Sequence, residues 1–148
     1  MENNTKQYRR TLKDYSVAVI FFMFLDIIDM LQSYTNGEYD IANAGDSAAI
    51  TAVCISVGAS LITVVTKLLI GIFGILQAKG KRNSHIHTVL AIIALTFSLF
   101  GIFMTVSSAL NGGYFDIYTT IQSLAAAAVL FLFIRAAQKL RKAEKNKI

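Results

Sequence analysis

Long apolar segments separated by short polar ones dominate this chain. No Asp, Glu, Lys or Arg occurs in the 33 residues from Asn83 to Phe115, or in the 18 residues from Ile117 to Ile134. A helix needs about 20 mostly apolar residues to cross a bilayer, and two comparable segments precede these. The pattern predicts an all-α membrane protein in which four transmembrane helices form a bundle with short loops.

The four predicted spans cover most of the chain. We place them at residues 14–33, 56–77, 88–110 and 117–137. The second helix is expected to extend beyond its span, from Ser47 to Gln77, a length of about 45 Å at 1.5 Å per residue. The polar segments 1–13 and 138–148 flank this transmembrane domain as basic tails.

The Lys and Arg residues predict the topology. Thirteen of the fourteen lie in the N-terminal tail, in the loop after the second span, or from Arg135 onward, whereas the opposite loops carry only acidic charges. Because the Lys and Arg bias of short loops sets orientation, both termini and Lys79–Ser84 are expected in the cytoplasm. Tyr34–Gly45 and Asn111–Asp116 are then outside. We therefore expect a multi-pass protein of a bacterial plasma membrane.

The net charge of +5 has the same explanation. Basic residues next to the spans suit an anionic inner leaflet, so they indicate the lipid bilayer as a partner and not a nucleic acid. Arg135 lies one turn from the basic tail and can extend to the inner headgroups. We interpret it as a membrane anchor.

A cleavable signal peptide is the alternative interpretation of the first span. Basic residues precede the apolar Val17–Leu25, and Ala42-Asn43-Ala44 resembles a cleavage site. That site lies far beyond the apolar stretch, however, and two aspartates follow the stretch directly. We expect the first span to be retained.

Three charged residues lie within the predicted spans, where charge is expensive and usually functional. Asp26 of the first helix and Lys67 of the second reach similar depths if the helices are antiparallel. Each side chain leans toward its own helix N-terminus, so the two are expected to meet. Asp29 follows Asp26 at i+3 on the same face.

Several roles for these charges stay open. The pair can fix the register of the first two helices, or Asp26, Asp29 and Lys67 can form a proton or cation site. The charges can also pair with a separate membrane partner. If the second span is instead residues 47–66, Lys67 is only an inner-boundary lysine.

Small and hydroxylic residues recur at steps of three and four on two helices. Such stripes let helix backbones approach in lipid, so we predict a packing seam between the second and third helices or toward the bundle centre. A hydrated pathway is the alternative. The predicted packing residues are Ser60, Thr63, Gly71 and Gly74 in the second helix, and Ala94, Ser98, Gly101, Thr105 and Ser108 in the third.

No catalytic or cofactor motif accompanies these features. His85 and His87 are expected in a solvated loop without a bound metal, and no phosphate-binding loop, Cys-pair motif or nucleophile elbow occurs. We expect neither a cofactor nor an enzyme activity. The leading hypothesis is an accessory, regulatory or assembly component that acts through helix–helix contacts, as a homo-oligomer or in a larger membrane complex. The alternative is an oligomeric proton- or cation-coupled small transporter or channel that uses Asp26, Asp29 and Lys67.

Overall fold

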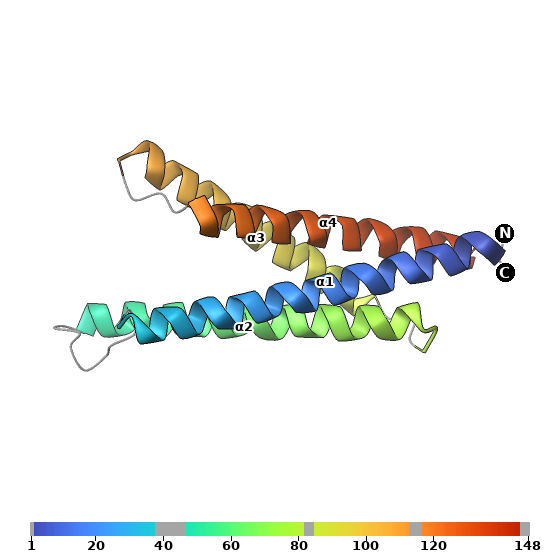
Figure 1. The fold of residues 1–148 in the computed structure, drawn as a ribbon, viewed down its shortest axis with the longest axis horizontal. Coiled ribbons are helices and arrows are strands. Elements are labelled where there is room, and N and C mark those ends of the chain that lie inside the picture. The colour runs from blue at the N-terminus through green and yellow to red at the C-terminus, as the bar shows by residue number, and fades with distance from the viewer. Residues whose placement is uncertain (1, 38–46, 82–84, 113–116, 146–148) are drawn as a thin grey trace.

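The computed structural model describes residues 2–37, 47–81, 85–112 and 117–145, and these form four α-helices (Figure 1). The helices are α1 (Glu2–Thr35), α2 (Ser47–Ala78), α3 (Ile86–Leu110) and α4 (Ile117–Lys145). Each of them is long and apolar enough to cross a membrane. The predicted all-α four-helix bundle is confirmed, and the four described helices suggest a multi-pass membrane protein.

The basic tails are largely helical. α1 begins at Glu2, so the polar segment that precedes the first predicted span belongs to the same helix, and α4 continues to Lys145. The proposed cleavage site, Ala42-Asn43-Ala44, lies outside the described residues.

A glycine with positive φ ends α2. Gly80 has a φ of 72°, its N–H donates to the Gln77 carbonyl at 2.8 Å, and the Lys81 N–H donates to the Leu76 carbonyl at 3.0 Å. These two hydrogen bonds form a Schellman motif, in which glycine adopts the left-handed conformation without the strain of a Cβ atom. The chain can therefore turn sharply toward α3.

The helices form two pairs that separate at one end of the molecule. α1 packs antiparallel to α2, and α3 packs antiparallel to α4, with further contacts between α1 and α4 and between α2 and α3. The start of α1, the end of α2, the start of α3 and the end of α4 lie at what we call the closed end. At the opposite, open end the two pairs diverge (Figure 1).

The hydrophobic core fills the closed half of the bundle. Leu12, Ile70, Phe133 and Leu140 are each 0% exposed and belong to one cluster. Toward the open end the large side chains are exposed, for example Leu110 at 83%. Side chains of the chain therefore fill the space between the helices in the closed half, whereas large apolar side chains stay exposed toward the open end.

Two glycines allow the close packing of this half. A Cβ atom at Gly71 would clash with the side chain of Ile20 and lie 3.1 Å from the Ser16 carbonyl oxygen. At Gly74 it would clash with Ser16 and lie 2.6 Å from the ring of Phe133. The atoms nearest to these glycines of α2 thus come from α1 and, at Gly74, also from α4.

The expectation of a solvated loop is wrong for His87. His87 lies in the first turn of α3, is 1% exposed, and stacks edge-to-face with Phe133 at 5.9 Å between ring centroids. α3 begins at Ile86, so the helix carries this side chain into the core, whereas His85 precedes the helix and is exposed. An apolar neighbour on α4, which the local sequence does not reveal, explains the burial.

Candidate functional site

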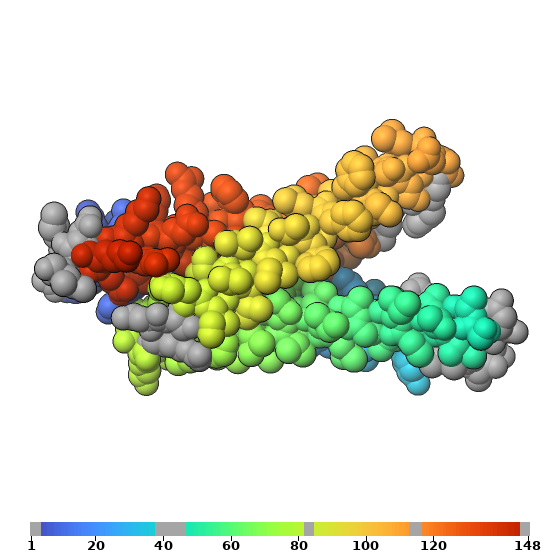
Figure 2. Space-filling view, turned by 180° about the vertical axis from the view of Figure 1, so that it is seen from behind, coloured from blue at the N-terminus to red at the C-terminus, as the bar shows by residue number. Residues whose placement is uncertain are grey.

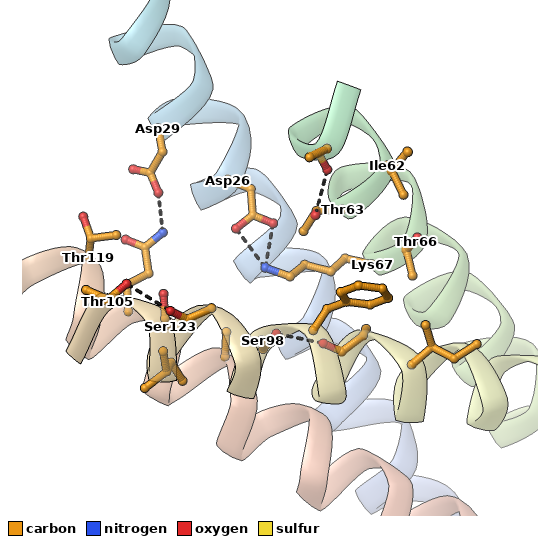
Figure 3. Close-up of a pocket in the computed structure, with 18 residues that line it drawn as sticks. Asp26, Asp29, Ile62, Thr63, Thr66, Lys67, Ser98, Thr105, Thr119 and Ser123 are labelled. Atoms are coloured by element: carbon orange, nitrogen blue, oxygen red, sulfur yellow. Dashed lines mark hydrogen bonds and ion pairs between the residues drawn. The ribbon is translucent and has the colours of Figure 1, made fainter. Parts of the chain in front are cut away.

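Asp26 and Lys67 form an ion pair between α1 and α2. The Lys67 ammonium lies 2.8 Å from one carboxylate oxygen of Asp26 and 2.6 Å from the other. The side chain of Lys67 is 8% exposed and that of Asp26 is 22% exposed. Burying either charge alone is costly, and pairing makes the burial tolerable. The predicted contact is confirmed, and the two side chains point toward each other (Figure 3).

Asp29 has a different partner, on α4. The side-chain amide of Gln122 donates to an oxygen of Asp29 at 2.6 Å. Because the donor is neutral, this hydrogen bond holds the carboxylate without cancelling its charge. The two aspartates of α1 therefore join that helix to two different neighbours, Asp26 to α2 and Asp29 to α4.

A cavity of about 600 Å³ lies beside these interactions, and all four described helices line it. Within the described part of the chain its charged residues are Asp26, Asp29 and Lys67, and these two carboxylates and one ammonium have a formal charge of −1. The polar neutral residues of the lining are Thr63, Thr66, Ser98, Thr105, Thr119, Gln122 and Ser123, and the apolar ones include Ile62, Ile93, Phe97 and Ile102.

The cavity lies where the helix pairs diverge. Seen from behind the view of Figure 1, the molecular surface is hollowed between the first half of α2 and the second half of α3 (Figure 2). On the other side, the Asp29–Gln122 hydrogen bond connects α1 to α4. Toward the closed end, the buried cluster around Ile70 and Phe133 fills the bundle. The polar space is thus open between α2 and α3 where the pairs diverge (Figure 2), and the core blocks it toward the closed end.

Hydroxyl groups of the lining are oriented by their own helices. The hydroxyl of Thr63 donates to the Ala59 carbonyl at 2.9 Å. Ser98 and Thr105 make the equivalent bonds one turn back, at 2.9 and 3.0 Å. A hydroxyl has only one proton to donate, so each of these three groups presents lone pairs, and not a donor, to the cavity.

The predicted packing residues divide between the two halves. Gly71, Gly74 and the partly buried Ala94 lie in or against the core, whereas Thr63, Ser98, Gly101 and Thr105 line the cavity together with Ala94. Nothing lies within 4 Å of a Cβ built at Gly101. Ser60 bonds to the Ser56 carbonyl of its own helix, and Ser108 is exposed. Most of the predicted packing residues of α3 thus line the cavity.

Arg135 is exposed in the closed half of α4. The position is compatible with the predicted membrane anchor, which stays a prediction. In the described part of the chain, no group of three or more His, Cys, Asp and Glu residues could hold a metal ion.

Sequence reasoning missed Gln122 as a partner of Asp29. The signal was present, because Gln122 is the only Gln or Asn in the uncharged run from Ile117 to Ile134, and a buried amide in an apolar helix needs a hydrogen-bond partner. What the sequence did not specify is which of the three other helices supplies that partner.

No family model matches the chain, and no curated protein or solved structure matches it.

Proposed function

We propose that this chain is a small non-enzymatic membrane protein that transports a proton or a cation, with Asp29 as the working carboxylate. The observation that carries the proposal is the cavity, which holds three charged groups midway along the bundle, is open at one end and is filled by the core at the other. A site that is closed toward one end of the bundle is what a transporter needs in each of its states. The oligomeric form of this transporter is part of the hypothesis.

The two aspartates have different roles in this proposal. Asp26 is neutralised by Lys67 at 2.6 and 2.8 Å, so we assign the pair to holding α1 and α2 in register. Asp29 contacts a neutral amide and no cation among the described residues, and a carboxylate without a cationic partner in an apolar span is a site for a proton or cation. The single charge of the cavity therefore resides at Asp29.

The orientation in the membrane follows from the basic residues. The closed end brings together the start of α1, the turn after α2 and the end of α4, and there Arg9 forms an ion pair with Glu144 at 3.0 Å. Since these are the Lys- and Arg-rich segments, we propose that the closed end is cytoplasmic and contacts the anionic leaflet. The cavity then opens to the outer side.

Flux measurements in reconstituted vesicles test this function. The wild-type protein should carry a proton or alkali-cation current that Asp29→Asn abolishes or reduces at least about tenfold, if the charge is the working group. Asp14→Asn is the matched control, because Asp14 lies on the same helix, is exposed and is remote from the cavity. Absence of flux in well-folded wild-type protein, or equal flux in Asp29→Asn, would rule out the proposed role.

A second candidate is the accessory or assembly component, and the uncovered face of α3 favours it. Gly101 has no atom within 4 Å of a Cβ built on it, and Phe97, one turn earlier on the same face, is 72% exposed. A small residue with no covering side chain permits close approach of another helix. Purification in mild detergent tests this candidate, since wild-type protein should co-elute with a defined membrane protein or a second copy and Gly101→Leu should not.

A further inference from the structure

We propose that the cavity binds a small organic ammonium ion with a hydrocarbon group, and that Asp29 is its counter-ion. This inference rests on the proposed function for its physiological meaning, and it specifies the substrate class of the same site. The charge, the hydrogen-bonding capacity and the size of the cavity each favour such a ligand.

The charge of the lining selects a cation. Lys67 is the one ammonium among the described residues of the lining, and both oxygens of Asp26 lie within 2.8 Å of it. The remaining charge is the Asp29 carboxylate, which accepts a hydrogen bond from the neutral Gln122 amide. An anion would be repelled by this carboxylate, whereas a monocation would neutralise it.

The hydrogen-bonding groups select a ligand that donates. The hydroxyls of Thr63, Ser98 and Thr105 donate their hydrogen bonds to backbone carbonyls, so toward the cavity they present only lone pairs. Together with the carboxylate they offer acceptors from α1, α2 and α3. An ammonium group carries donors and positive charge on one atom, so it satisfies both features of the lining. Asp29 lies on the side of the cavity where Thr105, Thr119 and Ser123 are found (Figure 3).

The size and the apolar surface favour an organic ion over a bare one. A volume of about 600 Å³ is within the range of sites for drug-sized molecules. A bare divalent cation such as Ca²⁺ or Mg²⁺ needs about six oxygen ligands converging at roughly 2.0–2.6 Å, which a wide cavity between diverging helices does not offer. Ile62, Ile93, Phe97 and Ile102 line the rest of the space and suit a hydrocarbon group.

Binding of 2-phenylethylammonium to the protein in zwitterionic nanodiscs, measured by calorimetry against empty nanodiscs, tests the inference. The matched probes are 2-phenylethanol, which has nearly the same shape without the charge, and 3-phenylpropionate, which reverses the charge. The ammonium should bind at least about tenfold more tightly than either, because a charge-assisted hydrogen bond is worth more than a neutral one. Equal binding of the alcohol, or no saturable binding of the ammonium, overturns the proposal.

Two variants assign the binding to this cavity. Asp29→Asn keeps an acceptor for Gln122 and should weaken ammonium binding at least about tenfold, while Asp14→Asn should bind as the wild type does. Gly101→Leu adds a side chain where the structure has open space, so it should weaken binding without touching the carboxylate. Unchanged affinity in Asp29→Asn refutes the assignment of the counter-ion.

The outcomes separate this inference from the transport function. Ammonium binding that depends on Asp29, without any flux in vesicles, supports the site and ends the transport proposal. Flux of protons or alkali cations that depends on Asp29, without ammonium binding, leaves the transport proposal standing and overturns the substrate class.

Discussion

The closed and open halves of the bundle are built from the same four helices and differ in what fills the space between them. In the closed half, glycines of α2 bring α1 and α4 close, and Phe133 occupies the centre at 0% exposure. In the open half, hydroxyl and carboxylate groups line a cavity of about 600 Å³. The comparison indicates that small residues alone do not close a helix interface. They do so where a large side chain on a neighbouring helix fills the groove they leave.

The ion pair lies at the boundary between the halves, and breaking it should have the largest effect. Lys67→Ala leaves Asp26 as an unpaired, largely buried charge, so the free energy of unfolding in mixed detergent micelles should fall by about 3 kcal/mol. The double variant Asp26→Leu with Lys67→Met should recover much of that loss. Additive losses in this cycle would show that the two residues do not stabilise each other.

Removing a large side chain from the closed half should have the next largest effect. Phe133→Ala deletes roughly 100 Å³ of packed volume, and at about 24 cal/mol per Å³ of cavity the loss of stability is about 2 kcal/mol. Transfer of the Phe133 side chain out of water adds nothing to this loss of stability, because the helices remain in the apolar environment when they separate. Phe97→Ala, at a 72% exposed position on the cavity, should change stability by less than about 0.5 kcal/mol. Similar losses in both variants would contradict the difference between the halves.

Glycine substitutions compare the two helix stripes directly. Gly74→Ala places a methyl group 2.6 Å from the Phe133 ring, and because that ring is fully buried it cannot move freely. We expect a loss of about 1–3 kcal/mol from overpacking. Gly101→Ala meets no atom within 4 Å, so it should be neutral or stabilise α3 by up to about 1 kcal/mol. A marked loss at Gly101 would mean that a second chain covers this face in the sample.

The ion pair at the closed end should matter least. The side chains of Arg9 and Glu144 are 41% and 26% exposed, and exposed pairs contribute about 0–1 kcal/mol. Arg9→Ala should therefore lower the unfolding free energy by less than about 1 kcal/mol, and 1 M salt should remove most of the difference. A larger, salt-independent loss would indicate that the Arg9 side chain, whose guanidinium lies close to Gly80, also packs at the closed end.

The sequence alone determined the four helices and the meeting of Asp26 with Lys67. Apolar length and charge spacing are local properties, and antiparallel neighbours that share a depth leave a buried charge few partners. Only the tertiary structure decided that Asp29 pairs with Gln122, that His87 is buried, and that the α3 stripe faces a cavity. These depend on the angle at which the two helix pairs diverge. Large side chains such as Phe133 pack against glycines that are distant in sequence, and this packing sets the angle. The periodicity within one helix does not encode such a fit between the surfaces of two helices.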